Sequence, residues 1–138
     1  RSHIEWVEGF LKDPGKTAVL AVLAPEDMAA GETLDLVGSV REAGINVLGA
    51  VLNYAVKSPF TPAEEKEVLA AAEGADGDVM RLAHLTISRA RATAKYKRTL
   101  RRSLPGAVIT APRLFKKDLS LEDLRALSVE IENQAGRE

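Results

Sequence analysis

The 138-residue sequence has no cysteine, two histidines and few aromatic residues, which make up 4% of the chain. The absence of cysteine excludes disulfides, thiolate zinc sites and thiol catalysis, and it fits a reducing compartment. Two histidines, His3 and His84, are too few for a structural metal site. No apolar run approaches the ~20 residues of a transmembrane helix, and no signal-peptide pattern opens the chain. These absences predict a soluble, cytoplasmic protein.

Neither sign of charge is in excess, because 19 Lys and Arg face 20 Asp and Glu and give a net charge of −1. This balance excludes a globally polybasic nucleic-acid binder, although it permits a local basic face. With 46% hydrophobic and 28% charged residues, wholesale disorder is excluded as well. The length suits one domain spanning 1–138. The start at Arg1-Ser2-His3 indicates a cloning scar over 1–3 or the cut edge of a longer protein.

Three short apolar runs alternate with helical patterns along the chain. The runs at 17–24, 46–52 and 107–111 are rich in Val, Leu, Ile and Ala, as expected of strands covered on both faces. Apolar spacing, capping residues and Pro or Gly stops predict helices over 4–11, 29–43, 61–74, 78–104 and from Ser120 onward. This order is typical of a parallel sheet with crossover helices. The predicted fold is therefore α/β, with three parallel strands that form half of a doubly wound sheet.

The strand ends are where a ligand is expected, since open α/β sheets bind ligands beyond the carboxyl ends of their strands. Asn53 offers a donor and an acceptor, as the edge of adenine does, or it closes the strand as an Asx turn. Glu26 could accept a hydrogen bond from a ribose hydroxyl, or place a favourable charge at the start of the next helix. Pro112 ends a strand whether or not a ligand binds there. Both interpretations of each residue stay open.

Gly15-Lys16-Thr17 superficially matches the end of a phosphate-binding loop. Such a loop needs a glycine five positions before its second glycine, and Phe10 occupies that position. It must also follow a strand and open a helix, whereas here a helix precedes and a strand follows. Lys16 is therefore interpreted as a solvated turn lysine.

Several segments carry a family resemblance, and the most specific of them combines Pro25-Glu26, Glu32-Thr33 and the strand-final Asn53. They are Asp13-Pro14, Thr17, APEDMAAGETLDLVGSVREAGINVLGAVLN over 24–53, RTLRRSLPG over 98–106 and APRLFKKDLSLEDLRAL over 111–127. In these segments the chain resembles the C-terminal half of the ArsA-type ATPases. This family includes the arsenite-pump-driving and guided-entry ATPases and belongs to the deviant-Walker P-loop NTPase superfamily.

The resemblance implies a P-loop NTPase-like fold in a protein that binds ATP with Mg²⁺ and couples its hydrolysis to anion transport or a similar task. Asn53 would read the adenine ring, and Pro112 and Arg113 would begin the loop that closes over the base. Glu26 would lie near a dimer interface and reach the nucleotide of a partner subunit or pseudo-equivalent half. Glu32 would be a further interface acid.

The departures from the family pattern limit this implication. The phosphate-binding loop and the switch aspartates that hold magnesium are missing, and in the family they lie upstream of this region. Without them nothing stabilises charge on a transferring phosphoryl group, so this chain is expected to contain no catalytic residue. No zinc is expected either, because the Cys-x-x-Cys pair of some members is absent. The alternative function is a catalytically inactive, stand-alone α/β protein-interaction module.

The predicted helix over 78–104 carries an unbalanced cluster of positive charge. Seven cations fall within fourteen residues, with no acid among them: Arg89, Arg91, Lys95, Lys97, Arg98, Arg101 and Arg102. One interpretation is a solvated helix face. The other is a site for an anionic partner, such as an acidic protein or a membrane surface to which the protein would be peripheral. Nucleic acid is the least favoured partner, because no aromatic stacking series accompanies the arginines.

Overall fold

The computed structural model describes residues 2–72 and 77–135. Five helices and three strands follow one another in the predicted order within these residues. They are α1 (Ser2–Lys12), β1 (Val19–Leu23), α2 (Asp27–Glu42), β2 (Val47–Ala55), α3 (Pro62–Ala72), α4 (Asp78–Ser103), β3 (Ala107–Pro112) and α5 (Leu121–Ala135). The α/β class predicted from the sequence is confirmed.

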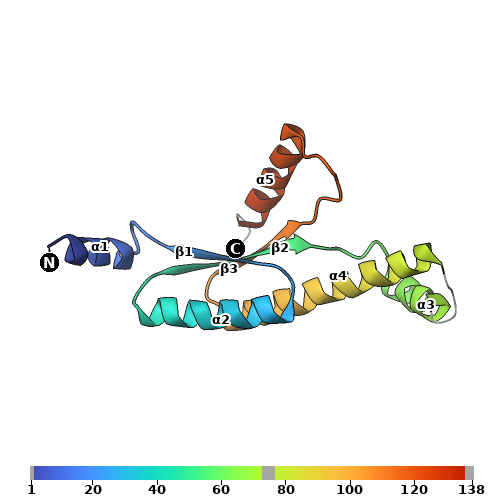
Figure 1. Ribbon diagram of the computed structural model, residues 1–138, viewed down its shortest axis with the longest axis horizontal. Coiled ribbons are helices and arrows are strands. Elements are labelled where there is room, and N and C mark those ends of the chain that lie inside the picture. The colour runs from blue at the N-terminus through green and yellow to red at the C-terminus, as the bar shows by residue number, and fades with distance from the viewer. Residues whose placement is uncertain (1, 73–76, 136–138) are drawn as a thin grey trace.

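The three strands form one parallel sheet in the order β1-β2-β3. Helices α2 and α4 lie side by side on one face of this sheet, while α5 lies on the other face against β3 (Figure 1). The short helix α3 packs on α4 beyond the end of the sheet. Both connections between neighbouring strands are therefore helical crossovers, as a parallel sheet requires.

The core lies between the sheet and the α2–α4 layer. Leu23 and Leu52 point into it from the strands, and Val37, Tyr96 and Leu100 enter it from the two helices. Leu52 and Leu100 are completely buried. Because α4 presents buried residues along much of its length, it is the main support of the strand ends at which a ligand was expected.

The prediction that the strands are covered on both faces is wrong for β1. Leu20 and Val22 point away from the α2–α4 layer and are 45% and 63% exposed. Val51 of β2 pairs with Val22 and so lies on the same side of the sheet. The physical reason is that α5 contacts β3 alone among the strands, and no other described helix reaches this side. We call the surface formed by Leu20, Val22 and Val51 the open sheet face.

The free edge of β3 is held by a side chain of α5. The N–H of Thr110 donates to Oε1 of Gln134 at 3.0 Å, and Nε2 of Gln134 donates to the carbonyl of Thr110 at 2.8 Å. The carboxamide of Gln134 thus occupies both backbone groups that a fourth strand would use. This pairing fixes α5 against β3 and blocks that part of the edge.

Helix α5, which the sequence predicts from Ser120 onward, begins with a capping box. The N–H of Ser120 donates to Asp123, and the N–H of Asp123 donates to the Ser120 hydroxyl. Hydrogen bonds lower the pKa of Asp123 to about 2. The largest effect comes from the Lys116 ammonium, and smaller effects come from the N–H and the hydroxyl of Ser120. The carboxylate therefore stabilises the folded state above the ordinary carboxyl pKa of 3.8, and this contribution is lost as the pH falls through about 2.

We expect a carboxyl-carbon NMR titration to give an Asp123 midpoint near pH 2. Lys116→Met should raise that midpoint toward 3.8, because the first cause of the low pKa is removed. Lys117→Met is the matched control and should leave the midpoint unchanged, since the lysine that binds Asp123 is Lys116. A midpoint that ignores both substitutions would contradict the assigned ion pair.

Candidate functional site

The carboxyl ends of the three strands meet at one cavity of about 270 Å³. Residues that follow β1, residues at the end of β2 and a residue that follows β3 line it, and α4 closes one side. The lining residues are Ala24, Pro25, Glu26, Tyr54, Val56, Arg89, Ala92 and Arg113. We call this the strand-end cavity. Its position is the one at which open parallel sheets bind ligands.

The sequence predicted that the second strand ends at Leu52, but β2 continues to Ala55. Asn53 is therefore not the last residue of the strand. Ala55 pairs with Pro112, and the N–H of Arg113 donates to the carbonyl of Ala55 at 2.8 Å. This pairing prolongs β2 through an irregularity between Leu52 and Ala55, where Tyr54 adopts a left-handed φ of 55°. Backbone of this kind is uncommon for a residue other than glycine, and it turns Tyr54 toward the cavity.

Asn53 supports this irregularity through its side chain. Its Oδ1 accepts a hydrogen bond of 2.9 Å from the N–H of Tyr54. Within residues 2–72 and 77–135, its Nδ2 forms no hydrogen bond. The contact is a local backbone contact of the kind that an Asx turn makes, while the amide donor stays available to a ligand.

The guanidinium of Arg113 lies between two aromatic rings. It is 5.9 Å from the ring centre of Tyr54 and 5.5 Å from that of Phe115. Both rings are more than half exposed. Cation–π attraction therefore holds the arginine at the cavity mouth beside flat surfaces on which a planar ligand can stack.

Of the other predicted site residues, some line the strand-end cavity and others do not. Glu26 lines it and is the exposed N-cap residue of α2, although its side chain forms no capping hydrogen bond. Pro112 lies within β3, one residue before Arg113, and is not among the lining residues. Glu32 is exposed on α2, away from the cavity. The structure thus brings Glu26 and Arg113 together, with Asn53 and Pro112 as sequence neighbours of lining residues.

Sequence analysis missed Tyr54 and Arg89 as lining residues. Arg89 was noticed only as one of seven clustered cations, because spacing along a helix does not reveal which turn passes the ends of the strands. Tyr54 lies at the predicted end of the strand, but no local pattern predicts its positive φ. An aromatic residue directly after a strand-final Asn is the one feature that could have indicated it.

The basic cluster of α4 is partly neutralised. Lys95 donates to Asp27 at 2.9 Å, and Arg91 binds Glu65 through two nitrogens at 3.0 and 3.1 Å. Two hydrogen bonds raise the pKa of Lys95: mainly the one to Asp27, and secondly the one to the Tyr96 hydroxyl. Lys97 and Arg101 also have partners. Among the seven cations of the basic cluster, all of which the structure describes, Arg89, Arg98 and Arg102 form no ion pair or hydrogen bond with the described residues.

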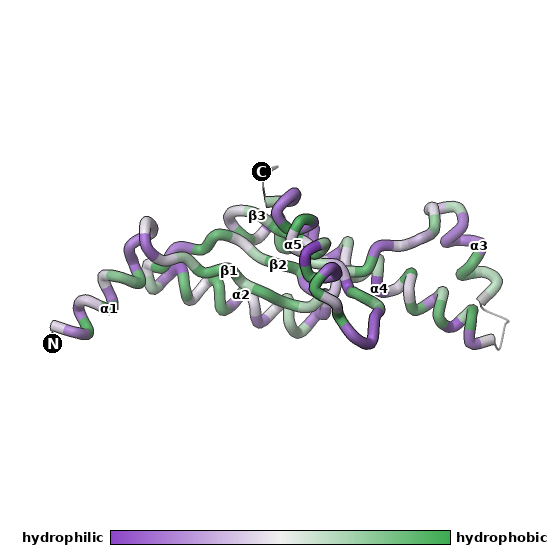
Figure 2. The backbone as a smooth tube through the Cα atoms, turned by 90° about the horizontal axis from the view of Figure 1, so that it is seen from above, coloured by the Kyte–Doolittle hydropathy of each residue, from purple (hydrophilic) through white to green (hydrophobic). Residues whose placement is uncertain are grey.

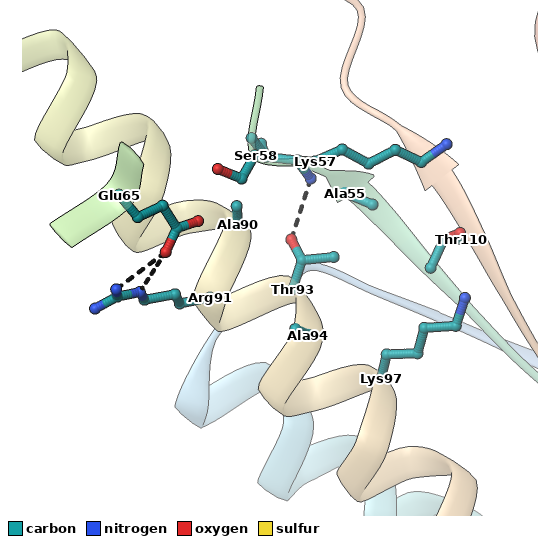
Figure 3. A pocket seen from close by; sticks show the side chains of 11 residues that line it. Ala55, Lys57, Ser58, Glu65, Ala90, Arg91, Thr93, Ala94, Lys97 and Thr110 are labelled. Carbon is teal, nitrogen blue, oxygen red and sulfur yellow. Dashed lines mark hydrogen bonds and ion pairs between the residues drawn. The ribbon is translucent and has the colours of Figure 1, made fainter. Parts of the chain in front are cut away.

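A second cavity, of about 380 Å³, lies between α4 and the residues that follow β2 (Figure 3). Thr93 joins its two walls, because its hydroxyl accepts from the N–H of Val56 at 3.1 Å and donates to the Arg89 carbonyl at 3.0 Å. Figure 3 shows Lys57 and Lys97 on either side of Thr110 at one end. Lys57 is paired with Glu130 at 3.0 Å. The polar groups of this cavity thus largely have partners within the protein, so the strand-end cavity is the stronger candidate.

Comparisons with protein-family models and with curated proteins find no match to this chain. Among residues 2–72 and 77–135, no three His, Cys, Asp or Glu side chains are grouped so that they could hold a metal ion. The absence of zinc therefore stays a prediction from the sequence. Over the same residues, no helix combines the length and apolarity needed to cross a membrane.

Proposed function

We propose that this chain is the adenine-cradling and dimer-interface portion of an ArsA-like ATPase. The phosphate-binding and magnesium-binding residues, and hence hydrolysis, would lie in another part of the protein. The supporting observation is the strand-end cavity, where residues from the ends of all three strands meet beside an arginine held between two aromatic rings. The residues that line the cavity suit the nucleoside part of ATP, and the magnesium ligands are expected outside this chain.

Each polar group at the cavity has a chemical task in this proposal. The Nδ2 of Asn53 donates to a ring nitrogen of adenine while its Oδ1 stays on the N–H of Tyr54. The aromatic rings and the Arg113 guanidinium give the base a flat surface. Glu26 accepts from a ribose hydroxyl, and Arg89 adds positive charge near the phosphates. In a dimer, or between two pseudo-equivalent halves, the ribose hydroxyl that Glu26 reaches would belong to the nucleotide of the partner.

Asn53→Asp separates the structural role of Asn53 from its role in binding. The variant keeps an oxygen for the N–H of Tyr54 but loses the amide donor. In the complete protein that contains this chain, we expect Asn53→Asp and Asn53→Ala each to weaken ATP binding by about 1–3 kcal/mol in isothermal titration calorimetry, which is the cost of an unpaired polar edge. The thermal midpoint of Asn53→Asp should stay close to that of the unsubstituted protein.

The matched control is Asn46→Ala, at the opposite end of β2 next to Val47. It should leave ATP affinity unchanged. Normal ATP binding by both Asn53 variants would show that Asn53 does not contact the base.

A protein-interaction module is the second candidate function. It is favoured by the exposed apolar residues of the open sheet face and of α1, which are the kind of surface that partners cover. Measuring ATP binding by the complete protein distinguishes the two functions. A complete protein that binds no ATP, with or without Mg²⁺, would leave the interaction module as the function.

A further inference from the structure

The backbone of Tyr54 is held in an unfavourable conformation beside the strand-end cavity. Its φ of 55° lies in the left-handed region, which side chains disfavour. Tyr54 lines the cavity and is 58% exposed, so burial of its ring does little to offset the strain. Strained residues persist where the surrounding structure fixes them, and they are concentrated at sites that bind or react. The bonds that fix Tyr54 therefore bear on the function of the cavity.

Two hydrogen bonds hold Tyr54 from within the sheet. One is local, since Oδ1 of Asn53 accepts from the N–H of Tyr54 at 2.9 Å. The other comes from β3, where the N–H of Arg113 donates to the carbonyl of Ala55 at 2.8 Å. The second bond also places Arg113, whose guanidinium lies 5.9 Å from the ring centre of Tyr54. The ring and the cation are thus positioned together.

Helix α4 supplies a third bond through Thr93. The hydroxyl of Thr93 accepts from the N–H of Val56, two residues after Tyr54, at 3.1 Å (Figure 3). The same hydroxyl donates to the carbonyl of Arg89 at 3.0 Å. Because its hydrogen is directed at Arg89, a lone pair of the oxygen stays available to Val56. Val56 and Arg89 both line the strand-end cavity, so one buried hydroxyl joins two of its walls.

Side-chain packing gives the segment after β2 little support on the side of α4. Figures 1 and 2 both show this segment running beside α4 toward α3. The second cavity, of about 380 Å³, lies between them, and small residues such as Ala90 and Ala94 line it from α4. Val56 is buried, so loss of the Thr93 hydroxyl would leave its N–H without this bond. The segment would then have room to shift into the cavity.

We infer that Thr93 is a positioning residue for nucleotide recognition and acts through Tyr54. By holding Val56 against α4, its hydroxyl keeps the ring of Tyr54 and the neighbouring Arg113 where a base can stack. The inference rests on the proposed function for the identity of the ligand, and it assigns Thr93 no contact with the nucleotide. Thr93→Val removes the hydroxyl and keeps the shape of the side chain, whereas Thr93→Ser keeps the hydroxyl.

ATP binding by the complete protein that contains this chain is the first test. Thr93→Val should raise the dissociation constant about 5- to 50-fold in isothermal titration calorimetry, as expected for residues in one hydrogen-bond network. Thr93→Ser should bind ATP like the unsubstituted protein. Thr110→Val is the matched control, because Thr93 and Thr110 are each 8% exposed and the Thr110 hydroxyl bonds to Gln134 on α5. Thr110 does not line the strand-end cavity, so this control should leave the affinity unchanged. Equal weakening by both valine variants, or none by Thr93→Val, would overturn the inference.

A double-mutant cycle tests whether Thr93 acts through Tyr54. In a Tyr54→Leu background, Thr93→Val should change the dissociation constant of ATP less than about twofold, because the ring that it positions is already gone. Two effects that multiply in full would contradict the role of Tyr54 in the inference.

Amide hydrogen exchange of the complete protein without nucleotide tests the positioning separately from the ligand. Thr93→Val should speed exchange at Val56 and Arg113 at least about 10-fold, because both N–H groups belong to the bonds that hold this stretch. Thr110→Val should leave both unchanged. Exchange that Thr93→Val does not alter would overturn the positioning role whatever ligand binds. Faster exchange in a protein that binds no ATP would instead overturn the proposed function and leave the positioning role of Thr93 standing.

Discussion

Gly49→Ala is expected to lower the free energy of unfolding by about 2–6 kcal/mol, a large part of the stability of a small domain. Gly49 lies within β2 with a positive φ of 142°, a conformation that side chains disfavour. A Cβ there would come within 2.9 Å of the backbone C and N of Ala107 and still closer to its carbonyl oxygen. The strain and the overlap add, because the neighbouring atoms are backbone and cannot rotate away.

Gly38→Ala is the matched control for this substitution. Gly38 lies in α2, and a Cβ there would meet no atom within 4 Å. Alanine should therefore stabilise the helix by about 0.5–1 kcal/mol. Urea unfolding followed by circular dichroism measures both variants. A Gly49→Ala protein as stable as Gly38→Ala would mean that β3 does not approach β2 as closely as the structure shows.

The need for glycine at position 49 could not be predicted from the sequence. The run from Asn46 to Leu52 was correctly predicted as a strand, because its Val and Leu content is a local property, but it is not buried throughout, since Leu48 is 56% exposed. The requirement for glycine arises only when β3 enters beside β2, so no local pattern indicates it. Likewise, the capping box of Ser120 and Asp123 could be predicted, since both residues act within one turn.

Some features of the candidate site could likewise be predicted from the sequence, and others depend on tertiary packing. Glu26 could be proposed from the general rule about strand ends, which needs only the strands and their order, whereas Arg113 was proposed from the family resemblance. The extension of β2 past Asn53 could not be found, because it depends on the pairing of Ala55 with Pro112 across the sheet. Arg89 reaches the cavity through the packing of a 26-residue helix, which periodicity alone does not position.

The open sheet face shows a further limit of apolar patterns. Leu20 and Val22 are as apolar as the buried Ala21 and Leu23, so the pattern of β1 predicts cover on both sides. The described helices do not supply that cover, because α5 contacts β3 alone among the strands and α1 contacts none of them. An apolar strand therefore predicts that a covering layer exists, and it leaves open which molecule supplies it.

Leu100→Ala should lower the free energy of unfolding by about 2–5 kcal/mol, since a completely buried side chain would be replaced by a cavity. Leu100 lies in the core between α4 and the sheet, together with Leu52 and Tyr96. Leu36→Ala on α2 is the control and should change the stability by less than about 0.5 kcal/mol, because Leu36 is 60% exposed. The two variants are compared by urea unfolding.

The same pair of variants tests what holds α4 against the strand ends. Because α4 brings Arg89 and Ala92 to the strand-end cavity, its packing through Leu100 determines where these residues lie. We expect Leu100→Ala to increase amide hydrogen exchange along α4 as well as to lower stability, whereas Leu36→Ala should change neither. A Leu100→Ala protein that loses less than about 1 kcal/mol would place the core elsewhere, and the support of the strand-end cavity would then have to come from the pairing of β2 with β3 alone.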